Sequence, residues 1–246
     1  MAQAFNSSQE VFGTIAGQAE DRTIRAGRYS YQKAAERRIL GDLLPKLQLQ
    51  PHHRVLDIGC GSGLLVIPFA QLAEQVVGLD HPDVVAALGR TINLPNIELI
   101  GGSFPATILS GTFDRIVAYS VMQCNPDYAS ALAFVRAAAG LLSPEGRLVI
   151  ADIPNADRRS RFRASARGQA FETEWIKLRD SSEATAEETE AFGTLATAGM
   201  LGQLTDAQIF DMASTLRADG YDVWIMPQSP DLPFGNTRED MVIVKP

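Results

Sequence analysis

The chain has few of the residues that mark extracellular, metal-binding or nucleic-acid-binding proteins. Its 246 residues include two cysteines and three histidines, and the formal net charge is −7. We therefore expect no disulfide framework and a reducing compartment, the cytoplasm. An acidic chain lacks the basic face that duplex binding requires, so no nucleic-acid partner is expected. The carboxylates form no cluster in the sequence that predicts a divalent metal site.

Long apolar runs are missing as well. No stretch approaches the length of a membrane span, and the polar N-terminus lacks the apolar region of a signal peptide, so no membrane partner is expected. Hydrophobic residues make up 46% of the chain, which is ordinary for a globular protein. This length and composition predict one α/β domain with a sizeable core and an additional segment.

The most informative segment spans residues 55–63 and has the sequence VLDIGCGSG. It predicts a buried strand with Asp57 near its end, followed by a tight turn containing Gly59, Gly61 and Gly63. Glycine is needed where the backbone turns sharply or where a ligand approaches it closely.

A second acidic residue follows at the expected distance. We predict a helix over residues 64–73 and a second strand over residues 76–80, which ends in Asp80. A strand, a glycine turn, a helix and a strand ending in an acid form the unit with which α/β folds bind the ribose of an adenosine.

Charge distinguishes between the adenosine cofactors. A dinucleotide lays its pyrophosphate on the glycine turn, which usually reads Gly-x-Gly-x-x-Gly, and Asp57 would repel those phosphates. Here the third glycine, Gly63, comes one residue early. S-adenosylmethionine has no phosphate and carries a sulfonium and an ammonium group, which a carboxylate attracts. The sequence therefore favours a cationic adenosyl ligand over NAD, and no Gly-Lys-Ser/Thr follows to indicate a P-loop.

Further motifs follow in order: GLD at residues 78–80, FDRIVAYSVMQ at 113–123 and LLSPEGRLVIAD at 141–152. With residues 55–63, they resemble the motifs of class I S-adenosylmethionine-dependent methyltransferases over roughly residues 35–153. The resemblance implies an α/β fold, a Rossmann-like doubly wound sheet of about seven mostly parallel strands. The last strand is expected to run antiparallel, and a helical insertion is expected after strand five.

The pattern divides the chain into four parts. Besides the helix at 64–73, helices are expected over 30–44, 83–90 and 126–142, and the last one is expected to begin with Thr205 as its N-cap. The predicted parts are an N-terminal cap at 1–34, a cofactor-binding core at 35–153, a helical insertion acting as a substrate lid at 154–203, and the last helix and two strands at 204–246.

Arginines crowd the start of the predicted insertion, at residues 158–167, and glutamates follow at residues 183–190. One interpretation is a solvated helix face whose arginines pair with those glutamates. The other is a lid in which Arg163 and Arg167 hold an anionic group of the substrate, such as a phosphate or carboxylate, by bidentate hydrogen bonds.

Individual residues can be assigned to the expected cofactor site. Ser103 and Phe104 stand where the family often has an acid that binds the adenine, and Tyr29 could close over the cofactor from the N-terminal segment. Open α/β folds bind ligands at the carboxyl ends of their strands. The full set of expected cofactor residues is Asp57, Gly59, Cys60, Gly61, Gly63, Asp80, His81, Ser103, Phe104, Ser120 and Tyr29.

The expected acceptor site lies beyond strands four and five. Asp152 is the best candidate for a general base by position, and Gln123 is the second expected catalytic residue. Gln123 is also expected to bind the substrate, together with Asn125, Asn155, Arg163 and Arg167.

The sequence thus predicts an enzyme that transfers the methyl group of S-adenosylmethionine to a small molecule, with O-methylation as the first hypothesis. The acceptor is expected to be anionic or sugar-linked. Methyl transfer is an in-line displacement, so alignment and desolvation of the two reactants are the main catalytic contributions. The alternatives are an NAD-dependent oxidoreductase and a non-catalytic module that binds an adenosyl ligand. A homodimer is left open.

Overall fold

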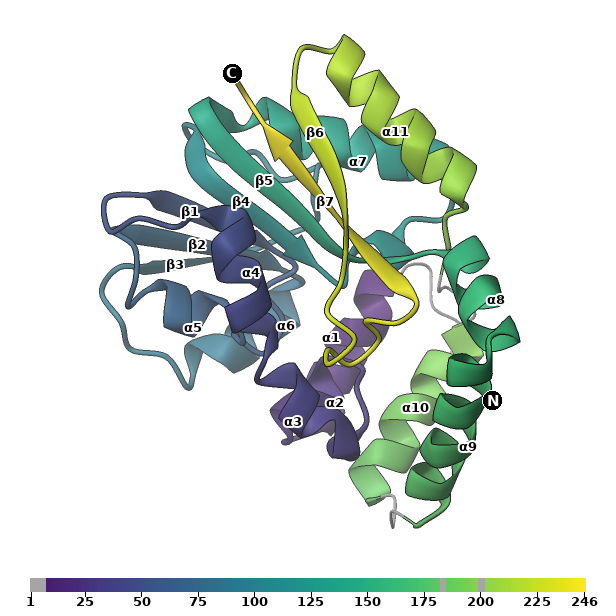
Figure 1. Ribbon diagram of the computed structural model, residues 1–246. Helices are drawn as coiled ribbons and strands as arrows, with labels where there is room; N and C mark the ends of the chain where they lie inside the picture. The colour runs from purple at the N-terminus through teal and green to yellow at the C-terminus, as the bar shows by residue number, and fades with distance from the viewer. Residues whose placement is uncertain (1–7, 182–184, 199–201) are drawn as a thin grey trace.

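The computed structural model describes residues 8–181, 185–198 and 202–246 (Figure 1). Parts of the predicted N-terminal cap and of the predicted insertion, including Glu183, lie outside the described residues. Within the described ranges, none of the helices combines the length and the apolar character needed for a membrane span.

A seven-stranded sheet forms the centre of the molecule, with the strand order β3-β2-β1-β4-β5-β7-β6. β7 is antiparallel to both of its neighbours, and the pairs among β1 to β5 are parallel. The predicted fold class is therefore confirmed. The strands are β1 (Arg54–Ile58), β2 (Gln75–Asp80), β3 (Ile97–Gly101), β4 (Phe113–Tyr119), β5 (Leu142–Pro154), β6 (Asp222–Pro227) and β7 (Arg238–Val244).

Helices cover both faces of the sheet, as Figure 1 shows for α4 on one face and for α7 and α11 on the other. Side chains alternate along each strand, so neighbouring residues enter different cores. Leu56 packs in the core beneath α7 and α11, whereas Val55 packs beneath α4 and α5. These helices are α4 (Ile39–Leu47), α5 (Val66–Phe69), α6 (Pro82–Gly89), α7 (Tyr128–Gly140) and α11 (Asp206–Ala218).

Two predicted helices are shorter than the sequence pattern suggests. The helix expected over 64–73 is reduced to α5, because Pro68 has no N–H to donate and the chain continues in tight turns, with Gln71 N donating to Pro68 O. The helix expected over 30–44 is broken into a 3₁₀ turn (Ser30–Gln32), α3 (Lys33–Glu36) and α4. The buried Glu36 stabilises this break, since it accepts hydrogen bonds from Thr23 Oγ1 and Arg28 Nη1.

Between β5 and α11 the chain forms three helices, α8 (Ala156–Ala164), α9 (Ala166–Ser181) and α10 (Ala186–Ala198). They extend beyond the sheet, and α10 lies beside the N-terminal helices α1 (Ser8–Gln18) and α2 (Arg22–Arg25) (Figure 1). α10 packs against α1 and α2 around a third apolar cluster, which contains Val11, Ile15, Ala19, Ile24 and Ala191. As predicted, α11 begins after an N-cap at Thr205, which forms a capping box with Gln208.

The insertion arginines do not pair with the following glutamates in the described residues. Three of them instead form ion pairs with other elements: Arg158 with Glu239, Arg161 with Asp206, and Arg163 with Glu172. Glu188 is buried and accepts hydrogen bonds from Ser30 N (3.1 Å) and Ser30 Oγ (3.0 Å). Glu188 therefore anchors the insertion to the N-terminal segment, and the predicted pairing with the arginines is wrong for this residue.

Candidate active site

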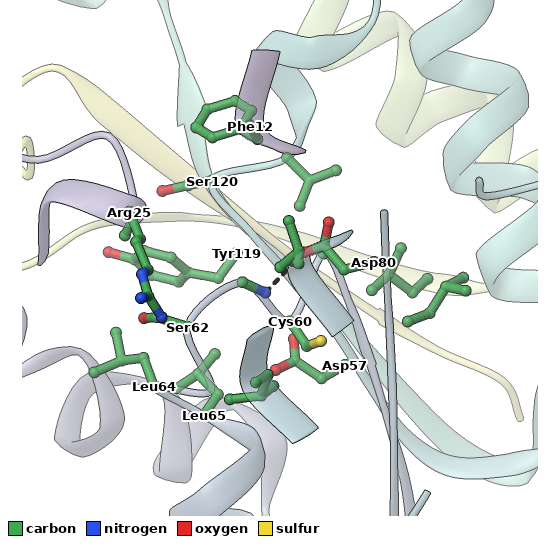
Figure 2. Close-up of a pocket in the computed structure, with 18 of the residues that line it drawn as sticks. Phe12, Arg25, Asp57, Cys60, Ser62, Leu64, Leu65, Asp80, Tyr119 and Ser120 are labelled. Atoms are coloured by element: carbon green, nitrogen blue, oxygen red, sulfur yellow. Dashed lines mark hydrogen bonds between the residues drawn. The ribbon is translucent and has the colours of Figure 1, made fainter. Parts of the chain in front are cut away.

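A pocket opens at the carboxyl ends of β1, β2 and β4 (Figure 2). Parallel strands bring these ends to one edge of the sheet, so residues distant in sequence meet there. The glycine turn forms one side of this glycine-turn pocket, which has a free volume of about 150 Å³. Of the expected cofactor residues, those that line it are Asp57, Gly59, Cys60, Gly61, Asp80, Phe104 and Ser120.

Two acidic residues lie close together in this pocket. Asp80 accepts hydrogen bonds from the backbone N–H groups of Gly61 and His81, each at 2.7 Å. Burial raises the pKa of Asp80, while those two hydrogen bonds act in the opposite direction. Burial, together with the nearby charge of Asp80, raises the pKa of Asp57 to about 8. The pocket is therefore suited to a ligand that brings positive charge and hydroxyl donors.

Two glycines of the turn have different roles. Both have positive φ, 51° at Gly61 and 82° at Gly63. A Cβ on Gly61 would have only Gly59 O nearby, at 3.9 Å, so the missing side chain leaves space in the pocket. A Cβ on Gly63 would lie 2.7 Å from Leu88 Cδ1. Gly63 does not line the pocket, and close packing against α6 is its contribution.

The N-terminal segment supplies residues that the sequence analysis did not select. Phe12 of α1 and three arginines, Arg22, Arg25 and Arg28, line the glycine-turn pocket. Figure 2 shows Phe12 and Arg25 on the side that the N-terminal segment forms. These arginines are spaced three residues apart in the sequence RTIRAGR, a pattern that indicates side chains on one shared surface.

Besides Gly63, three of the expected cofactor residues, Ser103, His81 and Tyr29, are not among the residues that line this pocket. Ser103 is exposed on the loop after β3, while Gly102 and Phe104 on either side line the pocket. His81 is the N-cap of α6, and its Nδ1 accepts from Asp83 N at 3.3 Å. Tyr29 stacks on Phe192 of α10, with ring centroids 4.0 Å apart. Tertiary packing directs Tyr29 toward the insertion, away from the expected cofactor contact.

A second pocket lies between the insertion and the loop that joins β6 to β7. This insertion pocket has a volume of about 370 Å³, within the range of small-molecule sites. Its aromatic side chains come from α8, α9 and the β6–β7 loop: Phe162, Phe171, Trp175 and Phe234. Its charged side chains are Arg159, Arg163, Arg238 and Glu172, which leaves a net positive charge in an otherwise acidic protein.

Three expected acceptor-site residues, Gln123, Asn155 and Arg163, line this pocket. Asn155 is also the N-cap of α8, where its side chain accepts from Arg158 N at 2.9 Å. Arg238 was not selected from the sequence. Its guanidinium stacks over the ring of Phe234 at 5.0 Å, a contact that only the folded loop creates.

The other three expected residues line neither pocket. Asn125 donates a hydrogen bond to Met122 O at 3.2 Å, and Arg167 is exposed on α9. Asp152 is 1% exposed and accepts a hydrogen bond from Ser120 Oγ. Asp152, the residue expected to act as a general base, therefore lines neither pocket. It contacts the glycine-turn pocket through Ser120.

Residues that line the two pockets come into contact just after the end of β4. Ser120 lines the glycine-turn pocket, and Gln123, which lines the insertion pocket, donates a hydrogen bond from Nε2 to Ser120 O. Cys60 and Cys124, which are not joined in a disulfide, also line the glycine-turn pocket. Among the residues that the structure describes, no group of three or more histidine, cysteine or acidic side chains is arranged to hold a metal ion.

Comparison with protein families gives a match over residues 30–193 to the model described as "Methyltransferase domain". This match covers more than half of the chain, including the glycine turn, the end of β4 and most of the insertion.

Curated relatives match shorter parts. The chain is 29% identical over 138 residues to protein-L-isoaspartate O-methyltransferase 2 of Rhodopseudomonas palustris, which is 54% of this chain and 59% of the relative. It is 32% identical over 144 residues to trans-aconitate 2-methyltransferase of Deinococcus radiodurans, 58% of this chain and 53% of the relative. The chain thus spans about half the length of these relatives.

Solved structures share the fold over nearly the whole chain. The DhpI–SAM–HEP complex has a TM-score of 0.62 at 16% identity, with 99% of this chain and 100% of that chain covered. Magnesium protoporphyrin IX methyltransferase from Synechocystis, with bound SAH, has a TM-score of 0.57 at 18% identity, with 96% and 94% covered.

Proposed function

This chain belongs to the class I S-adenosylmethionine-dependent methyltransferases, and we propose that it methylates an oxygen atom of a small anionic molecule bound in the insertion pocket. The observation that carries the proposal is the junction of two chemically different pockets at Ser120 and Gln123. One contains the glycine turn, two acids and three arginines near the N-terminus, and the other contains three arginines and a single acid. Membership of the methyltransferase family argues against the alternative of an NAD-dependent oxidoreductase.

The residues of the glycine-turn pocket fit S-adenosylmethionine. The open space at Gly61 admits a ligand close to the backbone. Asp80 would accept hydrogen bonds from the ribose hydroxyls, and the carboxylate of Asp57 would balance the ammonium group. Arg22 and Arg25 would bind the carboxylate of the methionine part. When bound, the cofactor supplies a methyl group activated by the sulfonium.

The acceptor is proposed to carry an anionic group and a flat or apolar body. Arg159, Arg163 and Arg238 offer guanidinium groups, and Glu172 offsets one of these charges by pairing with Arg163. Planar guanidinium groups bind carboxylates and phosphates by paired hydrogen bonds. The aromatic side chains of the pocket would contact the body of the acceptor and exclude water from it.

An oxygen acceptor is favoured by the residue at the junction. Gln123 donates a hydrogen bond from Nε2 to Ser120 O, and its Oε1 is buried without a hydrogen-bond partner. An acceptor hydroxyl could donate to this oxygen after a small movement and would then be oriented toward the glycine-turn pocket. Two curated relatives are named O-methyltransferases of protein L-isoaspartate and of ubiquinone biosynthesis, which is consistent with oxygen.

Catalysis by these residues is proposed to rest on alignment and desolvation. Gln123 would orient the acceptor hydroxyl, and the guanidinium groups would fix its anionic end, so that the reacting oxygen faces the methyl group. Asp152, enclosed behind Ser120, would help to position that residue and does not take the hydroxyl proton, which would pass to solvent water at the open side of the insertion pocket as the methyl group is transferred.

Two measurements test the proposal. Isothermal titration calorimetry with S-adenosylhomocysteine and with NAD should give heat only for the first, and tight NAD binding alone would contradict the cofactor assignment. Release of S-adenosylhomocysteine should then be measured with hydroxylated carboxylic acids and with their amides as matched neutral controls. Turnover of the acids but not the amides supports an anionic acceptor. Cofactor binding without turnover of any compound favours the non-catalytic module.

A further inference from the structure

Four side chains form a line of contacts from the glycine-turn pocket to the insertion pocket. Arg28 Nη2 donates to Ser120 Oγ at 3.0 Å, and Ser120 Oγ donates to Asp152 Oδ2. Arg238 Nε lies 3.7 Å from the other oxygen of the same carboxylate, Oδ1. Arg28 and Ser120 line the first pocket and Arg238 lines the second, so Asp152 joins residues of both.

Arg238 is the cation that compensates the buried negative charge of Asp152. The Asp152 side chain is 2% exposed, and a buried carboxylate needs a counter-ion. Arg28, at the far end of the line, is already paired with Glu36, also buried, at 2.9 Å. The side chain of Arg238 is 16% exposed, and its Nε and Nη1 are buried without a hydrogen-bond partner.

The backbone at the middle of this line is held in an unfavourable conformation. Ser120 and Asp152 have φ values of 57° and 61°, which residues other than glycine adopt only at an energetic cost. The backbone N–H of Asp152 donates to Asp240 Oδ1 at 2.9 Å, and Asp240 is itself paired with Lys46. Such conformations persist where surrounding contacts enforce them, which is common at functional sites.

We propose that Arg238, acting through Asp152, is a positioning residue for Ser120, so that a residue of the acceptor pocket sets the affinity for the cofactor. The inference rests on the proposed function, because it takes the glycine-turn pocket as the cofactor site. Loss of the Arg238 charge leaves the Asp152 carboxylate without its counter-ion. Asp152 then no longer fixes the position of the Ser120 hydroxyl. The affinity of the glycine-turn pocket for an adenosyl ligand then falls.

The test uses calorimetric titration of the full chain with S-adenosylhomocysteine. Arg238→Met should weaken binding about fivefold, as expected when one member of a connected polar network is removed. Arg238→Lys restores the charge and should bind within about twofold of the unchanged protein. Arg158→Met is the matched control, since Arg158 pairs at 3.4 Å with Glu239, the neighbour of Arg238 on β7, and should leave the affinity unchanged.

A double-mutant cycle separates coupling from general damage to the structure. In a Ser120→Ala background the line is already interrupted, so Arg238→Met should cause no additional loss of affinity. A loss that is fully additive, or a loss of the same size in Arg158→Met, overturns the inference. An Arg238→Met protein that folds and binds as tightly as the unchanged chain overturns it as well.

Asp152→Asn provides a second route if Arg238→Met fails to fold. It removes the carboxylate without stranding a buried negative charge, and it should weaken binding of S-adenosylhomocysteine by a similar factor. Unchanged affinity in this variant contradicts the inference. If the unchanged protein itself does not bind S-adenosylhomocysteine, the proposed function fails together with the coupling, whereas normal binding with no effect of these substitutions removes the coupling alone.

Discussion

The carboxylate of Asp80 and the backbone N–H of Gly61 are joined by a 2.7 Å hydrogen bond, which fixes the end of β2 against the glycine turn. Replacement of Asp80 by alanine should weaken binding of S-adenosylhomocysteine by about 1–3 kcal/mol, because charged hydrogen bonds to the turn and to the ribose are lost. Isothermal titration calorimetry measures this change.

Asp83→Ala is the control for that substitution. Asp83 lies three residues further along, and its side chain is 75% exposed on α6. The Asp83→Ala variant should bind S-adenosylhomocysteine with the affinity of the unchanged chain. Equal losses in the two variants would assign the effect to local charge and not to the Asp80 contact.

The raised pKa of Asp57, about 8, predicts that cofactor binding depends on pH. A ligand with an ammonium group favours the ionised carboxylate, so the complex holds fewer protons at Asp57 than the free protein does. Affinity for S-adenosylhomocysteine should therefore increase from about pH 6 to about pH 8, with release of protons to the buffer. Titrations in buffers with different ionisation enthalpies detect that release.

The same group links pH to the stability of the ligand-free protein. The folded pKa of Asp57 lies above the value of 3.8 for an unperturbed side chain, so the folded state binds this proton more tightly than the unfolded state does. The contribution to stability is complete below about pH 4 and is lost as the pH rises toward 8. Asp57→Asn should flatten this part of the curve of melting temperature against pH. A variant whose curve matches the unchanged chain would contradict the assignment.

Alanine at Gly61 and at Gly63 should have different consequences. Both substitutions carry the strain of a positive φ, about 1–2 kcal/mol. At Gly61 the new methyl group would occupy space in the pocket and prevent cofactor binding. At Gly63 it would collide with the buried Leu88, adding about 1–3 kcal/mol of destabilisation. Thermal denaturation together with calorimetric titration separates the two effects, and a reversed pattern would disprove the assigned roles.

The hydrogen bonds between Glu188 and Ser30 fix the N-terminal segment to α10. The Glu188 carboxylate accepts two hydrogen bonds from Ser30 and is 3% exposed, so Glu188→Ala should cost about 1–3 kcal/mol. Hydrogen exchange of residues 10–32 should accelerate in this variant. Thr189→Ala, in which only an exposed bond to Thr185 O is lost, is the control and should leave the exchange unchanged.

Much of the candidate cofactor site was predictable because its sequence signals are local. The segment around Gly61 and the acid at Asp80 follow from strand and turn patterns that the fold preserves. Ser103 and Tyr29 were harder to predict. Which of two neighbouring loop residues faces a pocket depends on packing, and Tyr29 lies against Phe192, more than 160 positions later.

By itself the sequence determined the order of strands and helices, the glycine turn and the preference for a cationic adenosyl ligand, because periodicity, backbone freedom and charge act over a few residues. Only the tertiary structure decided that Arg238 faces Asp152 and that the arginines of α2 reach the glycine-turn pocket. Those contacts join residues far apart in the chain, and their geometry depends on how the insertion and the last strands pack against the sheet.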